Sequence, residues 1–590
     1  MGDRVMEIKK SKISCPFFRI ITVLFLFFVA SSFISFRFQS EEDQIPQMAP
    51  VNEEFLKYQK DPWLATFSLY SEEGHPLGLL PSPHDVTHLT HLPAPAVSIE
   101  SLPASYDSRE KNKLTPVKNQ GDCGSCWAFA TYGSLESYLY PAENWDFSEQ
   151  NLINNHGLDW GPCYGGNMYL SAAYLTRWAG PIREEDDPYI YAADGATTRK
   201  HVQEILFIPP RKSHLGNDQI KQAVMTYGAV YTGMCWKSIC YNSTNRTYYN
   251  ASYDEGGHAI CIVGWDDNFD KNKFNTPPPG NGAFIVRNSW GKTWGDGGYF
   301  YVSYYDKYFG RREYNVVIKA ETPTNYEICY QYDSLGWTNS LGYGKDTAWF
   351  ANIFTANSTI PLTAVSFYTN ASQNSYEIYI YKDVVNSQPR SGKLAATKIG
   401  QINSAGYFTI KLNESVSLKL NQKFSVVVKL RTTEYNYPIP MEYPFKNYSS
   451  KAKAKAGESF ISSTGTTWYD LQNSYANTNV CLKAFGGYPP LYPPLNFGLQ
   501  RLENDYVFFK EYIDRLSWEA NPNNKTMVTK YRLYRKIKGA ADGTYQVIAE
   551  LGTSDFTYDD RGLKKNDLYS YWITAVDEYD RESEPALVSD

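Results

Sequence analysis

Short runs in which apolar and polar residues alternate dominate the second half of the chain. In residues 364–368, 376–381 and 424–428, aromatic and β-branched side chains recur, and Asn, Ser and Gly separate the runs. Such runs are typical of strands, because successive side chains of a strand point to opposite faces of a sheet. Their succession predicts a β-sandwich over residues 323–487.

A second group of strand-like runs ends the sequence. It follows residues 488–495, a proline-rich stretch that predicts a stiff linker. Within residues 496–590, the alternating runs 531–535 and 569–577 resemble strands of a fibronectin type III module. The second half of the chain is therefore expected to hold two all-β sandwich domains in succession.

The first half of the chain has a mixed pattern. Residues 102–322 combine helix-like and strand-like segments and are punctuated by Gly and Trp, which predicts an α+β domain. Residues 39–101 are polar, rich in Pro and His and without a long helical pattern, so we interpret them as a propeptide or spacer. Residues 1–38 place an apolar stretch after several Lys and Arg, as in a secretory signal peptide or, if uncleaved, a membrane anchor. Both interpretations predict a secreted or cell-surface protein.

Composition and charge narrow the classes of function. The 590 residues include 49 Tyr, 30 Phe and 14 Trp, which suits aromatic-rich strands. The formal net charge is -6 without a basic stripe, and we therefore expect no nucleic-acid partner. No ligand spacing suits Zn²⁺, and residues 266–270 match only the start of a calcium loop, so no metal or other cofactor is expected.

A cysteine at the start of a predicted helix is the candidate nucleophile. Cys126 precedes good helix formers with apolar positions at helical spacing through about residue 139. The first turn of a helix has unpaired N–H groups and the positive end of the helix dipole, which favour a thiolate. In a secreted protein a lone cysteine is more often half of a disulfide, so its meaning depends on partners elsewhere in the chain.

A histidine and an asparagine supply the expected partners. His258 opens a predicted buried strand 132 residues after Cys126, and Asn288 follows in the sequence Asn-Ser-Trp-Gly. The imidazole can act as the base that activates the thiol, and the asparagine oxygen can accept a ring N–H and fix the tautomer. Trp290 is placed to shield this hydrogen bond from water.

Together these motifs resemble the papain family of cysteine proteases. The sequence Cys-Gly-Ser-Cys-Trp at 123–127, followed by His and Asn in that order, matches the family signature, and the likeness runs from about residue 102 to 320. The resemblance implies a helical half, a β-barrel-like half, and hydrolysis of peptide bonds through a thioester on Cys126. It also identifies Gln120 as the side chain that stabilises the oxyanion together with the Cys126 N–H.

The resemblance implies further site residues. A disulfide should join Cys123 to Cys163, and the glycines that follow should present backbone groups to an extended protein or peptide substrate. Met168 and Gly257 are expected to shape the pocket for the side chain two residues before the cut, with a preference for apolar side chains. The substrate-binding residues expected on this basis are Gly165, Gly166, Met168, Gly257 and Trp290.

The remaining cysteines are assigned by their positions. Cys235 and Cys240 are close enough in the sequence to pair, and Cys329 and Cys481 bracket the middle β-domain and are expected to staple it. Cys261 lies in an apolar strand and is expected to be a buried free thiol.

Two questions stay open from the sequence. The region that begins near residue 330 resembles the lectin-like domain appended to some microbial papain-family proteases, which implies a glycan or cell-surface ligand, although its aromatic residues could simply fill the sandwich core. The chain could also be a surface adhesin with a vestigial protease domain. The presence of Cys126, His258, Asn288 and Gln120 favours an exported endopeptidase, and Asn rather than Asp at the third position argues against a transglutaminase.

Overall fold

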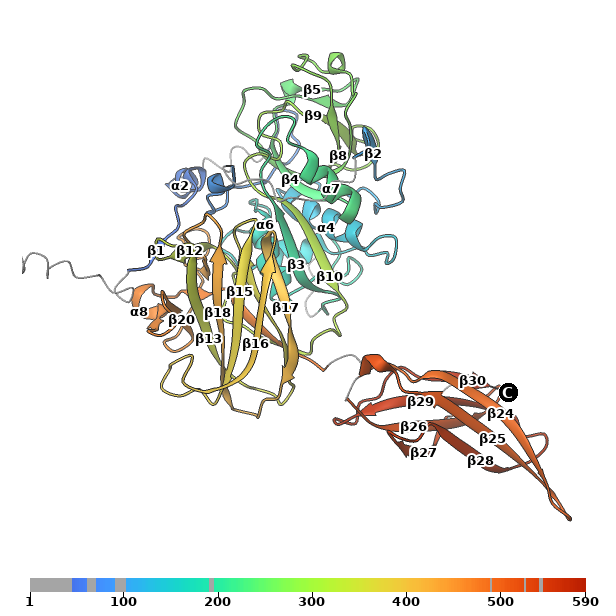
Figure 1. Ribbon diagram of the computed structural model, residues 1–590. Coiled ribbons are helices and arrows are strands. Elements are labelled where there is room, and N and C mark those ends of the chain that lie inside the picture. The colour runs from blue at the N-terminus through green and yellow to red at the C-terminus, as the bar shows by residue number, and fades with distance from the viewer. Residues whose placement is uncertain are drawn as a thin grey trace, which may run out of the picture. The chain divides into compact units, whose positions relative to one another are not determined.

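The computed structural model describes residues 45–60, 70–90, 102–189, 196–488, 491–524, 527–540 and 545–589 (Figure 1). The chain divides into two compact units, Met1–Gly487 and Tyr488–Asp590, and each is described by itself. The apolar stretch expected to be a signal peptide or anchor lies outside the described residues. Among the helices that are described, none combines the length and apolar character needed to cross a bilayer.

Helix α4 (Cys126–Leu139) is the central helix of the first unit. All of its residues except Tyr138 are buried. Helices α5 (Glu149–Asn155) and α6 (Met168–Thr176) contact it, and α6 is buried along its whole length. A helix that is apolar on all sides packs in the interior of a protein, and this places Cys126 at the start of an interior helix.

Strand β7 (Gly257–Asp266) carries the candidate histidine next to α4. It pairs antiparallel with β4 (Val230–Cys235) on one side and with β8 (Ala283–Arg287) on the other. Its sequence does not alternate because both faces are buried: one packs in the core around α4, and the other in an aromatic core on the far side of the sheet. The other elements of this region are β2 (Ser105–Asp107), β3 (His201–Ile208), α7 (Asp218–Tyr227), η3 (Ser238–Cys240), β5 (Tyr241–Asn242), β6 (Thr247–Tyr248), η4 (Lys271–Lys273), β9 (Tyr299–Ser303) and β10 (Asn315–Glu321).

Strand β17 (Ala405–Val416) connects the two halves of the first unit in one sheet. It pairs antiparallel with β3, with Tyr407 opposite Ile205, and with β14 (Leu362–Thr369) on its other side. The resulting sheet has 13 strands and extends from β11 (Ile328–Tyr330) to β5. The α+β region and the first β-domain are thus hydrogen-bonded to each other along a strand (Figure 1).

The first β-domain is a sandwich, as predicted. A 6-stranded sheet in the order β16-β15-β18-β13-β20-β21 faces the strands contributed to the large sheet, and Phe350, Phe367, Val426 and Leu482 are fully buried between them. Its further elements are β12 (Asn339–Gly342), β13 (Thr347–Thr355), β15 (Asn374–Lys382), β16 (Lys393–Ile402), β18 (Lys423–Thr432), β19 (Ile439–Glu442), β20 (Ser459–Ser462), β21 (Tyr469–Asp470), α8 (Leu471–Ser474), β22 (Asn479–Val480) and β23 (Leu482–Gly486).

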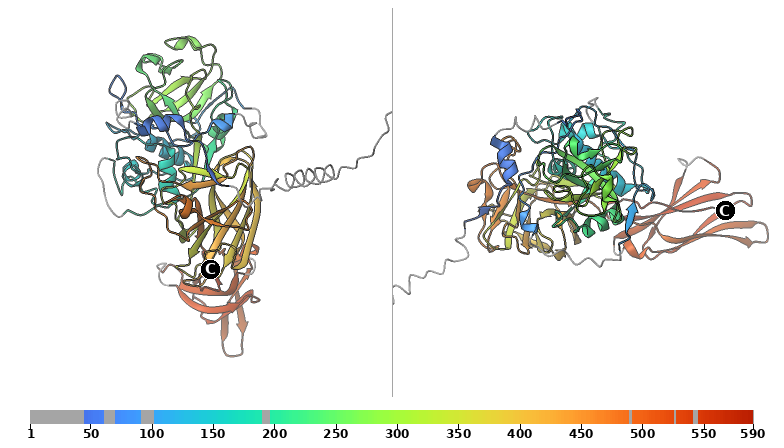
Figure 2. Two further views of the ribbon diagram at one scale, coloured as in Figure 1. Left: turned by 90° about the vertical axis from the view of Figure 1, so that its left-hand side faces the viewer. Right: turned by 90° about the horizontal axis from the view of Figure 1, so that it is seen from above.

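The segment before residue 90 packs against both halves of the first unit (Figure 2). Strand β1 (Gln47–Met48) pairs with β12 of the sandwich. Helix α2 (Glu53–Lys60) buries Phe55, whose ring lies edge-on to those of Phe445 and Tyr448 at centroid distances of 5.5 and 5.2 Å. Residues 76–82 lie along the α+β region. The short helix η2 (Thr87–Thr90) follows, and the ring of His88 stacks on Tyr435 of the sandwich at a centroid distance of 4.2 Å.

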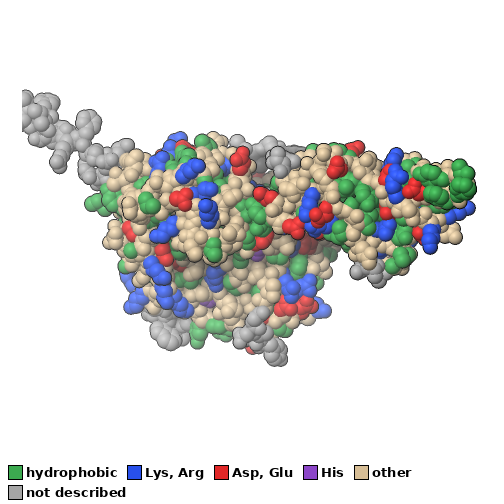
Figure 3. All heavy atoms as spheres, turned by 90° about the horizontal axis from the view of Figure 1, so that it is seen from below, with side chains coloured by type: hydrophobic (Ala, Val, Ile, Leu, Met, Phe, Trp, Pro, Cys, Tyr) green, Lys and Arg blue, Asp and Glu red, His purple; other side chains and the backbone are tan. Residues whose placement is uncertain are grey.

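The second unit consists of two antiparallel sheets, in the orders β24-β25-β28 and β27-β26-β29-β30. Trp518, Tyr531 and Ile573 are buried between them, so this unit is also a sandwich. On the molecular face in Figure 3, Lys and Arg side chains lie interspersed with Asp and Glu. The elements of the second unit are β24 (Leu495–Asp505), β25 (Lys510–Glu519), η5 (Pro522–Asn524), β26 (Val528–Ile537), β27 (Gln546–Gly552), β28 (Thr557–Leu563), β29 (Tyr569–Asp577) and β30 (Ala586–Ser589).

The disulfide pattern differs in part from the expectation. Cys123 and Cys163 are bonded, with Cα atoms 4.8 Å apart, and Cys261 is a buried free thiol, as expected. Cys329 and Cys481 are both free. Cys329 lies opposite Phe485 in the β11–β23 ladder, so Cys481 is four residues further along the antiparallel partner, about 13 Å away and beyond the reach of a disulfide.

The expected pairing of Cys235 with Cys240 is also absent. Cys235 ends strand β4, and its buried side chain lines a cavity beside the sheet. Cys240 is half-buried at the end of the turn η3 and packs against the aromatic core. The chain thus directs the two thiols into different surroundings although only four residues separate them.

Candidate active site

Cys126 is the first residue of α4, and its side chain is fully buried. Its Sγ accepts a hydrogen bond from the backbone N–H of Ala259 at 3.3 Å, which places the thiol beside the start of β7. Burial raises the pKa of the Cys126 thiol to about 12, against the opposing effect of backbone N–H groups, including those of Ala259 and Trp127. In this state of the protein, the thiol is protonated at neutral pH.

His258 precedes Ala259 and is oriented by Asn288. Its Nε2 lies 2.8 Å from Asn288 Oδ1. An amide oxygen can only accept, so Nε2 donates, and Nδ1 is left as the ring nitrogen that can take a proton. This Nδ1 is buried without a hydrogen-bond partner among the described residues. The backbone N–H of Ser289 also donates to Asn288 Oδ1, at 2.8 Å, and holds the amide in this orientation.

Trp290 covers the His258–Asn288 hydrogen bond. Its ring lies over the imidazole with a centroid distance of 4.8 Å and an interplanar angle of 25°. Burial lowers the pKa of His258 to about 4, and the hydrogen bond to Asn288 offsets this only in part. The thiol and the imidazole are therefore both uncharged at neutral pH in this state.

Gln120 lies at the turn that precedes α4. Its Oε1 accepts from Ser289 Oγ at 2.6 Å, and its Nε2 donates to the carbonyl of Cys123 at 2.8 Å. An amide NH₂ carries two hydrogens, so one N–H remains for an oxygen atom near Cys126. Ser289 thus contacts both Gln120 and Asn288 and connects the turn before the thiol with the partner of the imidazole.

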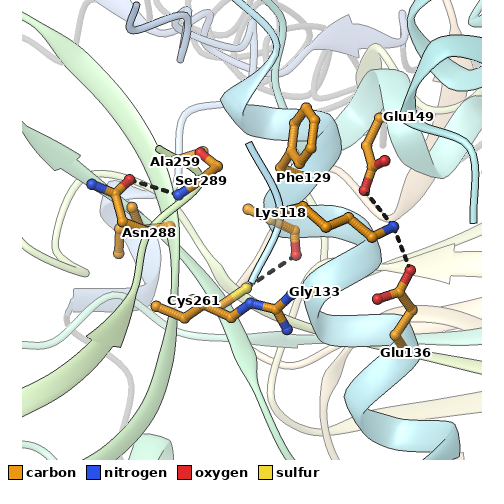
Figure 4. Close-up of a pocket in the computed structure, with 12 residues that line it drawn as sticks. Lys118, Phe129, Gly133, Glu136, Glu149, Ala259, Cys261, Asn288 and Ser289 are labelled. Atoms are coloured by element: carbon orange, nitrogen blue, oxygen red, sulfur yellow. Dashed lines mark hydrogen bonds and ion pairs between the residues drawn. The ribbon is translucent and has the colours of Figure 1, made fainter. Parts of the chain in front are cut away.

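A buried ion cluster, Lys118 with Glu136 and Glu149, supports this turn from behind (Figure 4). Lys118 Nζ lies 2.8 Å from Glu136 and 3.0 Å from Glu149. Thr115 Oγ1 donates to the other oxygen of Glu136 at 2.7 Å. Burial raises the pKa of Glu149, Lys118 acts in the opposite direction, and Asp146 adds a further ion pair to Lys118 Nζ at 2.6 Å. The ion cluster links the chain before Gln120 to helix α4, and the sequence motifs did not predict it.

The cleft beside these residues is filled by the chain's own segment 76–82. The carbonyl of Gly257 accepts from the N–H groups of Gly78 and Leu79, at 3.2 and 3.0 Å. Gly166 donates to the carbonyl of Gly78 at 2.9 Å and accepts from the N–H of Leu80 at 2.9 Å. The segment therefore pairs with both walls of the cleft, as an extended peptide would.

Glycine is required where the segment and the walls touch. A Cβ at Gly257 would lie 2.1 Å from the carbonyl oxygen of Leu79, and one at Gly78 would lie 2.3 Å from that of Gly124. Gly165 has φ +89 and would place a Cβ 2.8 Å from Leu80. These contacts explain why glycines occur on both sides of the cleft.

The start of this segment and the residue before it also cover Trp290. The ring of His75 stacks on the indole at 4.5 Å, and Trp290 Nε1 donates to the carbonyl of Pro76 at 3.1 Å. Of the expected substrate-binding residues, Gly165, Gly166, Gly257 and Trp290 lie at the cleft. Met168 lies in the core at the start of α6, and it is absent from the described residues that line the neighbouring cavity.

Comparisons with known proteins identify two regions of this chain. Residues 102–320 match the sequence profile of the papain family cysteine proteases, and residues 329–486 match that of the lectin-like domain. The chain is 30% identical over 204 residues to cathepsin K of Mus musculus and 34% identical over 215 residues to procathepsin L of the same species, which is 34% of this chain in each case. It spans only 59% and 60% of the length of these relatives.

A solved structure similar to this one extends over both domains. The cysteine protease and lectin-like domains of Cwp84, a surface layer associated protein of Clostridium difficile, superpose with a TM-score of 0.64 at 27% identity, covering 76% of this chain and 99% of that one. A second Cwp84 structure, obtained after propeptide cleavage, gives a TM-score of 0.58 at 28% identity and covers 65% of this chain and 99% of that one. The α+β region of this chain is therefore a papain-family cysteine protease domain, and the sandwich that follows it is a lectin-like domain.

Proposed function

We propose that this protein is an exported cysteine endopeptidase that hydrolyses peptide bonds with Cys126, His258, Asn288 and Gln120. The observation that carries the proposal is the arrangement around His258. Its Nε2 is fixed by Asn288, its Nδ1 is left unpaired, and the next residue contacts the Cys126 thiol through its backbone N–H.

In the proposed reaction, His258 Nδ1 takes the proton of Cys126, and the thiolate attacks the carbonyl carbon of the substrate. The negative oxygen of the tetrahedral intermediate accepts hydrogen bonds from the Cys126 N–H and the second N–H of Gln120. The imidazolium gives its proton to the leaving amine as the C–N bond breaks, which leaves a thioester on Cys126. His258 then removes a proton from a water molecule that attacks the thioester, and the acid product and the thiol are released.

The segment 76–82 is proposed to hold the enzyme inactive. It occupies the groove that a substrate backbone would need, and the burial to which it contributes favours an uncharged thiol and imidazole over the thiolate–imidazolium pair. Removal of the segment would open the groove and admit water to both groups. These contacts support the expected role of residues 39–101 as a propeptide.

The lectin-like domain is proposed to direct the protease to a glycan or another ligand at a cell surface. Its similarity to the domain of a surface layer associated protein supports this assignment. The hydrogen bonds between β17 and β3 would hold the cleft in a fixed orientation to whatever the lectin-like domain binds.

The test uses the full chain before and after limited proteolysis that separates residues 39–101 from the rest. Both samples are treated with an epoxide inhibitor that is selective for papain-type thiolates, the label is mapped by mass spectrometry, and casein cleavage is measured. We expect labelling of Cys126 and cleavage only after proteolysis, and loss of both in Cys126→Ala. Cys261→Ala serves as the control. Cys261 is also a buried free thiol, but it packs between β7 and α4 and has no part in the proposed reaction.

If the treated chain is neither labelled nor active, the alternative of an adhesin with a vestigial protease domain becomes the better explanation. Labelling without cleavage of casein would leave the nucleophile in place but contradict the assignment as a general endopeptidase.

A further inference from the structure

A cavity of about 620 Å³ opens beside the segment in the cleft. On the protease side it is lined by β4 residues and by the loops that precede β7 and β10. On the other side it is lined by the segment, by residues 70–72 and by α2. The lining residues that matter here are Leu79, Gly233, Arg312 and Glu313. The volume exceeds what a leucine side chain fills, so the cavity has room for a longer side chain that enters from the groove.

The backbone directs one side chain of any bound strand toward this cavity. Leu79, whose N–H pairs with Gly257, places its Cδ2 only 2.7 Å from the position that a Cβ of residue 233 would occupy. Gly233 therefore leaves a passage that a larger residue would close. Its carbonyl accepts a hydrogen bond from the N–H of Gly310 at 3.0 Å, which brings the loop carrying Glu313 next to the passage.

Glu313 is a carboxylate in this cavity without a cationic partner. One oxygen accepts only the backbone N–H of Ser82, at 3.3 Å, and the other is buried without a partner among the described residues. Burial raises the pKa of this carboxyl to about 7, although the Ser82 N–H and Arg312 act in the opposite direction. A buried carboxylate oxygen that accepts no hydrogen bond lowers the stability of the folded protein unless a donor pairs with it.

The cations around the cavity are already engaged. Arg312 donates to the carbonyl of Asp254 at 3.0 Å and lies 4.2 Å from the ring centroid of Tyr308. Lys237 forms ion pairs with Glu72 at 3.2 Å and with Glu255 at 3.1 Å. When the segment leaves the cleft, Ser82 leaves with it, and Glu313 loses its one hydrogen-bond donor.

We propose that Glu313 makes this subsite selective for substrates with an Arg or Lys side chain at the position that replaces Leu79, taken as the second residue before the cut. The inference rests on the proposed peptidase function. A guanidinium group can donate two hydrogen bonds to one carboxylate and would satisfy the vacant oxygen of Glu313. This differs from the apolar preference expected from the sequence, which counted Met168 and did not include Glu313.

The test compares fluorogenic peptides that differ only at the second residue before the cut, which is Arg, Lys, Leu or Gln. The full chain is first activated by limited proteolysis, and kcat/KM is measured for each peptide. We expect kcat/KM to be higher for the Arg peptide than for the Leu peptide by about tenfold or more, and Glu313→Gln to reduce this ratio to about one. The exposed carboxylate Glu110 provides the control, and Glu110→Gln is expected to keep the preference.

Equal rates on Arg and Leu peptides in the unmodified protein, or an Arg preference that survives Glu313→Gln, would overturn the proposal while leaving the peptidase intact. Absence of cleavage of every peptide would instead contradict the peptidase function itself. If Glu313→Gln fails to fold, Glu313→Asp keeps the charge but shortens the side chain, and a reduced Arg-to-Leu ratio is expected from it.

Discussion

Charged and polar groups are buried in the lectin-like domain and at the cleft, but at these two places they are arranged in different ways. In the lectin-like domain, Lys483 and Asp333 are almost fully buried and lie 2.6 Å apart. In the cleft, His258 Nδ1 and Asn288 Nδ2 are buried without partners among the described residues. The first arrangement neutralises charge inside the domain, and the second keeps polar atoms unpaired beside a thiol. Buried polar groups that lack partners cost stability, so the unpaired atoms at the cleft fit the catalytic role proposed for His258 and Asn288.

The largest effect on activity is expected from removal of the Cys126 thiol at the cleft. Cys126→Ala should lower kcat for peptide hydrolysis by about 10⁴-fold or more, because no other group in the cleft can form the thioester. The midpoint of thermal unfolding should change little, because one buried sulfur with a single weak hydrogen bond is removed. Activity assays and calorimetry on the same preparation check both parts, and a large fall in stability would contradict the contrast.

The opposite result is expected in the lectin-like domain. Lys483→Met should destabilise the first unit by about 3–5 kcal/mol, because Asp333 would be left as an uncompensated buried charge. Urea unfolding of the full chain measures this. Lys393→Met, at an exposed position of β16, is the control and should change stability by less than about 0.5 kcal/mol. Equal effects of the two substitutions would show that the buried pair is not structural.

The contact between the segment and the cleft gives a third test. Gly78→Ala should weaken the binding of segment 76–82 in the cleft by about tenfold or more, because the new Cβ would lie 2.3 Å from the carbonyl oxygen of Gly124. The full chain should then react with the epoxide inhibitor without prior proteolysis. Gly74→Ala has a similarly unfavourable φ of +81 but no atom within 4 Å of the new Cβ, so it should leave the cleft closed. Reaction of both variants would point to backbone strain rather than to the contact.

The smallest expected effect concerns pH. Burial raises the pKa of Glu442 in the lectin-like domain to about 8, from an ordinary value of 4.5. The folded chain therefore holds a proton that the unfolded chain releases, so this group lowers stability progressively as the pH rises from about 4.5 to 8. Glu442→Gln cannot ionise and should reduce the fall in unfolding free energy over this range, by about 1–2 kcal/mol. Parallel urea titrations at pH 5 and pH 8 measure the difference, and identical pH dependence of the two proteins would contradict it.

Local motifs could be interpreted from the sequence because their spacing is local or shared with a family. The helix that starts at Cys126, the buried strand that starts at His258 and the disulfide between Cys123 and Cys163 all belong to this class. The sandwich of residues 323–487 was predictable because alternation along a strand reports which face is buried.

Contacts between distant segments could not be predicted in this way. The pairing of Tyr407 with Ile205 depends on backbone hydrogen bonds, which leave no mark on side-chain pattern. The distance between Cys329 and Cys481 depends on the register of the β11–β23 ladder. That register does not follow from the positions of the two cysteines at the ends of the domain. Glu313 was missed because its environment is assembled from Ser82, Gly233 and its own loop, which lie far apart in the chain.

The ladder between β17 and β3 also limits how the protein can be divided. Cutting the chain between the two domains would leave both strands with a row of unpaired N–H and C=O groups, over the pairs from Ala405–Phe207 to Phe408–Glu204. Such bare strand edges are templates for pairing with other molecules. Either domain produced alone would therefore be prone to aggregate, and an exchange of lectin-like domains among proteases of this kind would need to reproduce this edge as well as the binding surface.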